Sequence, residues 1–172
     1  MANPARSLRR VYAYVAYRLG DGPDAEDVTG EVLENALRYR ASFDPARGAP
    51  DTWLLGIARR CVSHHLSSRV TLAESPEIAA AGNLEAEAVE RIALESALGR
   101  LSERDRDLLA LRYGADLKER RIAEILELST GAVEVALHRA RNRLRAEIEA
   151  QEAPQEAKSS DRSSFVGGVG EV

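Results

Sequence analysis

Acidic side chains recur at helical spacing in the segment that follows Pro23. Asp27, Glu31 and Glu34 stand at positions i, i+4 and i+7, so they would share one face of a helix. Paired carboxylates can act as general acid and base, but that chemistry also needs a nucleophile or a metal-ligand set, and this segment offers neither. Acids in the first turn of a helix complement its dipole, and runs of charge are usually solvated. The spacing alone therefore favours a solvated acidic face.

The single cysteine of the chain stands close to two histidines. Cys61, His64 and His65 occupy positions i, i+3 and i+4 and could hold a metal ion, but no fourth ligand stands near them in the sequence. One cysteine also excludes a disulfide framework and a cysteine-rich zinc site. The sequence contains no glycine-rich phosphate loop and no catalytic-triad spacing. We therefore expect no catalytic residue, no metal and no cofactor.

Arginine-rich segments indicate a different chemistry, the binding of nucleic acid. Four Arg fall within the seven residues from Arg139 to Arg145, and the segment from Arg59 to Arg69 has three Arg, two His and no acid. Such clusters can contact DNA phosphates even in a protein that is acidic overall, as this one is with a formal net charge of −4. The low net charge argues against tight nonspecific DNA binding by the isolated chain.

Apolar residues recur at helical spacing along most of the chain, which predicts an all-α protein. Two small helical domains are expected, at residues 1–69 and 92–150. A flexible linker at residues 70–91, with one basic and five acidic residues, would join them, and a disordered tail would follow at residues 151–172. No apolar run approaches the roughly 18 residues that span a bilayer, and no signal peptide is evident, so we expect a cytoplasmic protein.

Three helices are expected in the first domain, the first of them ending at Leu19. Asp24 is expected to cap the second helix, and Asp51 or Thr52 the third, after a loop at residues 41–50. The apolar stripe that we expect the second helix to bury consists of Val28, Val32, Leu33, Ala36 and Leu37. The corresponding stripe of the third helix consists of Leu54, Ala58, Cys61, Val62 and Leu66.

The second domain carries the sharpest pattern, a predicted helix-turn-helix from Ile122 to Arg145. Ala123 is small enough for a second helix to cross closely, and Ser129 or Thr130 can cap that helix. Its buried stripe would be Val133, Leu137, Ala140 and Leu144. Its other face, which would enter the DNA major groove or lie along phosphates, presents Glu134, Val135, His138, Arg139, Arg141, Asn142 and Arg145. The plainer alternative is an ordinary helical hairpin with a basic end.

Trp53, the only tryptophan, stands at the start of the third helix. A tryptophan on a helix usually packs in the core. The functional alternative is a stacking platform for an unpaired base, because polar and basic residues follow it along the same helix. These residues are Arg59, Arg60, Ser63, His64, Ser67 and Arg69.

Taken together, the motifs resemble two regions of the bacterial extracytoplasmic-function (ECF) sigma factors, which belong to the primary-sigma superfamily. The resemblance to region two rests on Asp24-Ala-Glu-Asp-Val28, Glu31, Phe43-Asp44-Pro45, Arg47-Gly48 and Thr52-Trp-Leu-Leu-Gly-Ile-Ala-Arg59. The resemblance to region four rests on Leu98, Leu101-Ser-Glu-Arg-Asp-Arg106, Leu111-Arg-Tyr113, Ile122-Ala-Glu-Ile-Leu126 and Leu137-His-Arg-Ala-Arg141. It extends over residues 5–69 and 92–148, in the order and with the linker length of that family.

The resemblance implies an alternative sigma factor, which binds RNA polymerase core and directs promoter recognition. Its partners would be the β′ clamp helices and the β flap of the core enzyme, promoter DNA and an anti-sigma factor. The implied polymerase contact involves Asp24, Glu26, Asp27 and Glu31. The implied minus-ten contact, where the duplex is opened, involves Trp53, Arg59, Arg60, Ser63, His64, Ser67 and Arg69. The implied minus-thirty-five contact involves Ser129, Thr130, Glu134, Val135, His138, Arg139, Arg141 and Arg145.

The recognition helix departs from the family pattern, which commonly has Lys and Arg where this chain has Glu134 and Ala136. A carboxylate can accept a hydrogen bond from cytosine N4, but phosphate repels it, so minus-thirty-five binding should be weak or unusual in sequence. One alternative is therefore a degenerate sigma-like regulator that acts through polymerase or an anti-sigma protein without directing transcription. A conventional helix-turn-helix repressor is another, and an enzyme is the least expected class.

Overall fold

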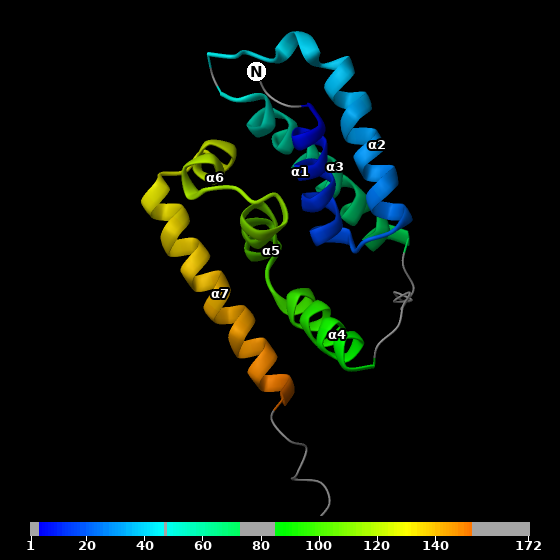
Figure 1. Cartoon of the computed structure of the whole chain (residues 1–172), viewed down its shortest axis with the longest axis vertical. Coiled ribbons are helices and arrows are strands. Elements are labelled where there is room, and N and C mark those ends of the chain that lie inside the picture. Colours follow the sequence, from blue (N-terminus) through cyan, green and yellow to red (C-terminus); the bar gives the residue numbers. More distant parts are fainter. Residues whose placement is uncertain (1–3, 47, 73–84, 153–172) are drawn as a thin grey trace, which may run out of the picture.

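The computed structural model describes residues 4–46, 48–72 and 85–152, and every regular element within these ranges is helical, as the sequence predicts (Figure 1). Much of the expected linker and nearly all of the expected tail lie outside the described residues. The first half contains α1 (Pro4–Leu19), α2 (Pro23–Arg38), the short 3-10 helix η1 (Arg40–Ser42) and α3 (Pro50–Leu72). The second half contains α4 (Glu85–Arg100), α5 (Glu103–Leu109), the π-helical turn η2 (Ala110–Gly114), α6 (Glu119–Leu126) and α7 (Thr130–Glu152).

In the first half, α1, α2 and α3 pack against one another around a shared apolar core. The prediction that Asp24 caps α2 is wrong: Gly22 is the N-cap, and Pro23 occupies the first turn. Likewise α3 already begins at Pro50, so Asp51 lies in its first turn rather than at the cap. The physical reason is the same in both cases, because the fixed φ of proline and its missing N–H suit the first helical position. The core-forming residues here include Val11, Tyr14, Val15, Val28, Val32, Leu55, Ala58 and Val62.

The apolar stripe of α2 is only partly buried. Val28 and Val32 lie in the core, as predicted, but Leu33 is 39% exposed and Leu37 is 68% exposed. The prediction that both leucines are buried is wrong. α1 and α3 cover only part of the circumference of α2, and the side chains of Leu33 and Leu37 lie outside the covered part. They therefore form part of an open surface.

In the second half, α7 packs against α4, α5 and α6. Ser102 caps α5: its hydroxyl accepts a hydrogen bond from the backbone N–H of Asp105 at 3.2 Å and donates to the Asp105 carboxylate at 2.9 Å. That buried carboxylate also accepts two hydrogen bonds from Arg143 of α7, at 2.9 and 2.8 Å. These contacts fix the angle between α5 and the helix that would bind DNA.

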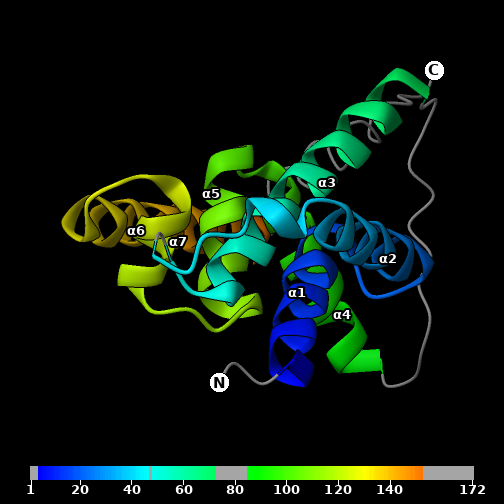
Figure 2. The same ribbon diagram turned by 90° about the horizontal axis from the view of Figure 1, so that it is seen from above.

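The two halves pack directly against each other, so that one hydrophobic cluster contains residues of both. α1 packs on η2, and α3 packs on α6, while α5 lies between the two groups of helices (Figure 2). Two helical domains are predicted from the sequence, but their mutual contact is not. It joins segments about ninety residues apart in the chain, such as Tyr14 and Asp107, and local periodicity carries no information on such pairs.

Candidate nucleic-acid and polymerase interfaces

The helix-turn-helix formed by α6 and α7 has the predicted burial pattern. Ile122, Ala123 and Val133 are buried where the two helices cross. The hydroxyl of Ser129 accepts a hydrogen bond from the backbone N–H of Ala132 at 3.2 Å, so Ser129 caps α7. A well-formed cap satisfies one of the otherwise unpaired N–H groups at the start of a helix, which is the end that approaches base edges.

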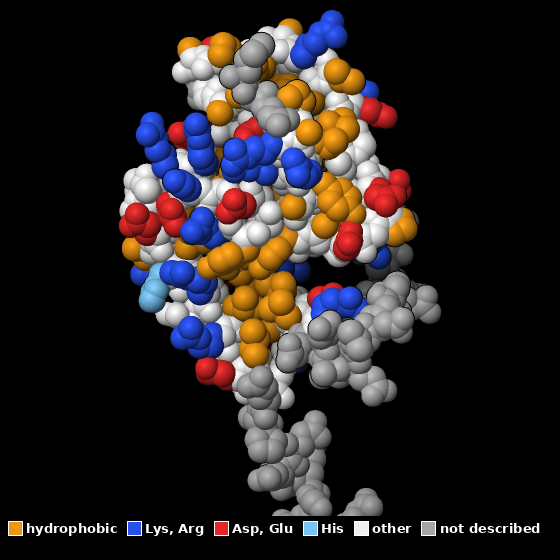
Figure 3. Space-filling view, in the orientation of Figure 1, with side chains coloured by type: hydrophobic (Ala, Val, Ile, Leu, Met, Phe, Trp, Pro, Cys, Tyr) orange, Lys and Arg blue, Asp and Glu red, His pale blue; other side chains and the backbone are white. Residues whose placement is uncertain are grey.

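The outer face of α7 is open to solvent along its whole length. Basic side chains, all of them Arg, lie along this helix (Figure 3). The side chains that are exposed on this face include all those predicted to contact DNA from within the helix, namely Thr130, Glu134, Val135, His138, Arg139, Arg141 and Arg145. His138 and Asn142 also lie within hydrogen-bonding distance of each other, at 3.1 Å.

The turn between α6 and α7 is made by a residue in the left-handed region. Glu127 has φ 55° and ψ 42°, a conformation that costs a non-glycine residue about 1–2 kcal/mol. Its backbone N–H bonds to the carbonyl of Ala123, and Leu128 then packs against the core. The turn therefore holds the geometry of a helix-turn-helix at the expense of backbone strain.

The predicted minus-ten residues lie along α3, mostly on an exposed face. Arg60, Ser63, His64, Ser67 and Arg69 are exposed, and Ser67 donates a hydrogen bond to the carbonyl of Ser63 at 2.8 Å. Arg69 forms an ion pair with Asp24 at the start of α2. Arg59 differs from the others, because its guanidinium is engaged by the second half of the protein.

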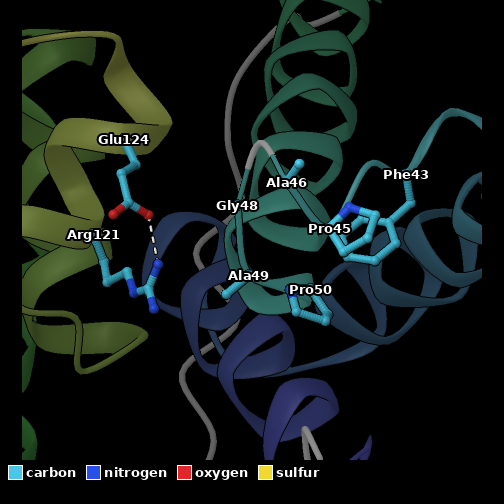
Figure 4. Close-up of a pocket in the computed structure, with 8 residues that line it drawn as sticks. All are labelled: Phe43, Pro45, Ala46, Gly48, Ala49, Pro50, Arg121 and Glu124. Atoms are coloured by element: carbon cyan, nitrogen blue, oxygen red, sulfur yellow. Dashed lines mark hydrogen bonds and ion pairs between the residues drawn. The ribbon is translucent and has the colours of Figure 1, made fainter.

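Trp53 packs as the plainer of the two alternatives predicts, and its role as a stacking platform stays a prediction. It packs against the edge of the core, and its ring lies 5.5 Å from that of Phe43, measured between centroids, at a tilt of 55°. Phe43 also lines a shallow hollow of about 580 Å³ beside the loop between η1 and α3, which Arg121 and Glu124 of α6 face from the other side (Figure 4). The remaining lining residues are Pro45, Ala46, Gly48, Ala49 and Pro50.

The acidic residues of α2 are divided between two environments. Glu26, Asp27 and Glu31 are exposed on α2, the helix that also carries the exposed Leu33 and Leu37. Asp24 instead pairs with Arg69, and it lies 3.7 Å from the ring nitrogen Nε2 of His65. The structure therefore leaves three of the four predicted polymerase-contacting acids exposed on α2 and pairs the fourth with the end of α3.

The sulfur of Cys61 is buried and accepts a weak hydrogen bond from Asn35 at 3.5 Å. Burial raises the pKa of the Cys61 thiol, which disfavours the thiolate that a metal ion would need. Within the described ranges, no group of three or more His, Cys, Asp or Glu side chains is placed to hold a metal ion.

A buried carboxylate joins the two halves. Asp107 of α5, which is only 8% exposed, accepts a hydrogen bond from the Tyr14 hydroxyl at 2.6 Å and one from Nε of Arg59 at 2.7 Å. Nη1 of Arg18 lies 3.5 Å from the same carboxylate, and the guanidinium of Arg18 also pairs with Glu103. We call Tyr14, Arg18, Arg59 and Asp107 the Asp107 cluster. Burial and the negative charge of Asp107 strongly raise the pKa of Tyr14, so its hydroxyl remains a donor.

Comparisons with known proteins agree with both halves. The family model for sigma-70 region 2 matches residues 5–71, and that for sigma-70 region 4 matches residues 91–144. The ECF RNA polymerase sigma factor BldN of Streptomyces coelicolor is 32% identical over 143 residues, which cover 76% of this chain and 53% of BldN. The ECF sigma factor SigW of Bacillus subtilis is 28% identical, over 81% of this chain and 83% of SigW. The chain belongs to the ECF sigma factors.

Two solved structures share the fold of this ECF sigma factor. The sigma factor RpoE of Bartonella quintana, solved with the anti-sigma factor NepR, has a TM-score of 0.63 at 23% identity, over 83% of this chain and 92% of RpoE. CnrH, solved with the cytosolic domain of CnrY, has a TM-score of 0.55 at 22% identity, over 85% of this chain and 82% of CnrH. The chain spans about half the length of BldN but most of the length of SigW.

Sequence reasoning about this ECF sigma factor missed the Asp107 cluster. A partial signal exists, because Asp107 directly precedes the apolar run Leu108-Leu-Ala-Leu111 in a helix that must bury most of its surface. A charged residue in such a place needs a partner. The sequence does not say, however, that the partners are Tyr14, Arg18 and Arg59.

No helix in the described ranges has the length and apolar character of a membrane span.

Proposed function

We propose that this chain acts as an alternative sigma factor that binds RNA polymerase core and directs it to promoters through both halves of the molecule. We assign region two to residues 1–69, the linker to residues 70–91 and region four to residues 92–150. One observation carries the proposal: the capped helix α7 buries its apolar stripe and presents its entire predicted DNA-contacting face to solvent. The cytoplasm, where polymerase and chromosome meet, is the expected place of action.

Region four reads the minus-thirty-five element with α7. Arg139, Arg141 and Arg145 contact phosphates and position the helix, which gives no sequence preference by itself. Glu134 and His138, one turn apart on the exposed face, are placed to contact base edges. Because a carboxylate accepts from the amino group of cytosine, Glu134 favours a C·G pair at its contact.

Region two binds the polymerase through α2. Leu33, Leu37 and Tyr39 are exposed large apolar residues, and Glu26, Asp27 and Glu31 lie on the same helix. Apolar side chains exposed beside charge mark protein-binding surfaces more often than DNA-binding ones, and the acids repel DNA. The surface therefore suits the β′ clamp helices, whereas region four would contact the β flap. An anti-sigma factor is a further expected partner for the same surfaces.

Region two binds the opened minus-ten element with α3 and the adjoining loop. Extruding a base from the duplex costs a few kcal/mol, which stacking on an aromatic ring and contacts in a pocket can offset. The Phe43–Trp53 pair, the hollow beside it and the basic face of α3 provide such groups on one side of the region. Arg59, Arg60 and Arg69 would contact the backbone of the unpaired strand.

Transcription-start mapping tests the proposal directly. Purified core polymerase would transcribe genomic DNA with and without this protein, and new starts that share upstream elements are expected. The Arg141→Ala variant should lose starts that depend on the upstream element. Arg104→Ala is the control in the same region, because Arg104 of α5 is an exposed arginine outside the predicted DNA-contacting set. If no new starts appear while core is active with another sigma factor, the proposal is wrong.

Core binding tests the role of α2 separately. Leu37→Asp should weaken binding to core at least tenfold, since it places a charge in the centre of the proposed contact. Leu8→Asp is the matched control, because Leu8 is a similarly exposed leucine on α1, away from α2's outer surface. Equal weakening by both substitutions would argue that α2 is not the contact.

Glu134 favours a second candidate function. A carboxylate in the middle of the recognition face weakens phosphate contact, as expected of a sigma-like regulator that binds polymerase or an anti-sigma factor without directing transcription. Core binding without new transcription starts would support this second function.

A further inference from the structure

The exposed face of α7 carries arginines on both sides of a central line of residues. Successive residues of a helix are turned by about 100°, so Val135, His138 and Asn142 lie within about 60° of one another around the helix. The arginines flank this line in pairs one turn apart, Arg139 with Arg143 on one side and Arg141 with Arg145 on the other. A helix that lies in the major groove with phosphates at both flanks turns its central line toward the base edges.

His138 and Asn142 contact each other in the middle of this face. Nδ2 of the Asn142 amide lies 3.1 Å from Nε2 of the His138 ring, and both residues are exposed. An amide nitrogen can only donate, so Nε2 of His138 must accept. A neutral imidazole carries a single proton, and the hydrogen bond that one ring nitrogen makes determines which nitrogen holds it. The proton of His138 therefore lies on Nδ1.

This tautomer leaves His138 one donor, Nδ1–H, with which to contact a base. In the major groove, guanine presents two adjacent acceptors, O6 and N7, whereas adenine presents one acceptor beside an amino donor. Cytosine presents only an amino donor, and thymine presents one acceptor beside its methyl group. The Nδ1–H tautomer is thus matched to guanine. The opposite tautomer would present an acceptor and match the amino groups of adenine and cytosine.

We propose that Asn142 is a positioning residue for promoter recognition: its amide holds His138 in the Nδ1–H tautomer, and His138 donates to a guanine of the minus-thirty-five element. The proposal rests on the proposed function, which places α7 in the major groove. In that function Glu134, one turn before His138, accepts from cytosine, so successive turns of α7 present an acceptor and a donor. Asn142 acts through the ring that it orients.

A contact of this spacing can also be purely structural, because hydrogen-bonded side chains four residues apart stabilise a helix slightly. Variants at residue 142 separate the two roles, since only the positioning role makes the base preference follow the tautomer. Asn142→Asp replaces the amide with a carboxylate of similar shape that can only accept. The proton of neutral His138 then moves to Nε2, and Nδ1 becomes the acceptor. Asn142→Ala removes the contact altogether.

The first measurement is the tautomer of His138 in the full-length protein without DNA. Nitrogen-15 NMR at about pH 8.5, where histidine rings are neutral, distinguishes a protonated ring nitrogen from a bare one. The chain has 3 histidines, and the signals that His138→Ala lacks are those of His138. His64 and His65 of α3 are internal references. We expect a bare Nε2 in wild type, a protonated Nε2 in Asn142→Asp and a mixture in Asn142→Ala.

The second measurement is the base preference of the full-length protein bound to polymerase core. The complex captures duplexes that are randomised at the minus-thirty-five element, and sequencing identifies the position whose preference His138→Ala abolishes. Wild type should enrich guanine about fivefold there, which corresponds to one neutral hydrogen bond. Asn142→Ala should reduce this enrichment to about twofold or less. Asn142→Asp should shift the preference to adenine or cytosine.

Ala146→Asp is the matched control for the negative charge that Asn142→Asp adds. Ala146 is exposed on α7 and lies about 12 Å beyond His138 along the helix. A carboxylate there repels phosphate and lowers the overall capture of duplexes, but it does not reach the His138 ring. We expect the His138 signals and the guanine preference of this variant to equal those of wild type.

A protonated Nε2 in wild type, or His138 signals that Asn142→Ala leaves unchanged, overturns the proposal. A base preference that both Asn142 variants share with wild type also overturns it, and transcription starts would then leave the proposed function standing. An equal change of preference in Ala146→Asp does the same, because charge rather than the tautomer would determine the preference. Guanine enrichment that follows the tautomer, without new starts on genomic DNA, supports the positioning role and overturns the proposed function.

Discussion

The hydrogen bond between Tyr14 and Asp107 offers the sharpest test of the packing between the two regions. Tyr14 is fully buried, and its hydroxyl donates to the carboxylate at 2.6 Å. Tyr14→Phe removes the oxygen and keeps the ring, so it leaves no large cavity. Hydrogen bonds to charged groups contribute about 1.5–3 kcal/mol. Because Asp107 keeps Arg59 as a partner, we expect the free energy of unfolding to fall by the lower part of that range, about 1.5–2 kcal/mol.

Urea denaturation followed by far-ultraviolet circular dichroism measures this change. Tyr12→Phe is the control, since it deletes a hydroxyl that bonds a carboxylate, Asp21, on the exposed surface. It should cost less than about 0.5 kcal/mol. If Tyr14→Phe and Tyr12→Phe have the same small effect, the Tyr14–Asp107 bond does not exist in solution, and the packing of region two on region four is refuted with it.

The same bond makes stability depend on pH in the alkaline range. Burial, and then the charge of Asp107, raise the pKa of Tyr14 above its ordinary value of 10.0, so the folded state favours the protonated phenol. The resulting stability is fully present below pH 10 and is lost as the pH rises beyond it, because the unfolded chain then releases a proton that the folded chain retains. Tyr14→Phe should therefore lose less stability than wild type between pH 8 and about pH 10.5. An identical alkaline loss in both proteins would contradict the assignment.

Three further substitutions test separate features. Glu134→Gln should tighten binding to a minus-thirty-five duplex about twofold to fivefold at physiological salt, because an exposed charge interaction is worth about 0.2–1 kcal/mol. Fluorescence anisotropy measures this affinity, and an unchanged value would mean that Glu134 does not face the DNA. Gly30→Ala should raise the free energy of unfolding by about 0.5–1 kcal/mol in urea titrations, because the glycine lies within α2 and a Cβ there meets nothing within 4 Å. A loss of stability would mean that this face of α2 is covered. Glu127→Gly should raise the melting temperature by a few degrees. It relieves about 1–2 kcal/mol of backbone strain from the left-handed conformation, which exceeds the extra conformational entropy that a glycine loses on folding. An unchanged melting temperature would indicate that the turn relaxes in solution.

Local signals were sufficient to predict most of the fold and one of the candidate interfaces. The Ser102 and Ser129 caps, and the burial of Val133 and Leu137 opposite an exposed polar face, follow from short-range spacing. In a helix-turn-helix, buried and exposed faces alternate within a few residues, so the sequence determines both. The sequence therefore predicts the geometry of α7 well, whereas the DNA contacts assigned to it stay a prediction.

The packing between distant segments was not predictable in the same way. Leu37 has the spacing of a core residue, yet it lies beyond the reach of α1 and α3, and only the positions of those helices reveal this. Arg59 stands in a predicted DNA-binding segment, and nothing near it in the sequence indicates that Asp107, 48 residues later, neutralises it. The place of Gly114 against the backbone of α1 likewise depends on how the regions dock, which no spacing around Gly114 indicates.

The Arg59–Asp107 contact also ties the sequence of one half of the chain to that of the other. Removing the partner of a buried charge leaves that charge uncompensated, which costs far more than losing an exposed ion pair. Substitution of Arg59 should therefore destabilise the protein through Asp107, which is only 8% exposed, and a second substitution that removes this carboxylate should relieve part of the cost. Among related chains, the residues at these two positions are accordingly expected to change together.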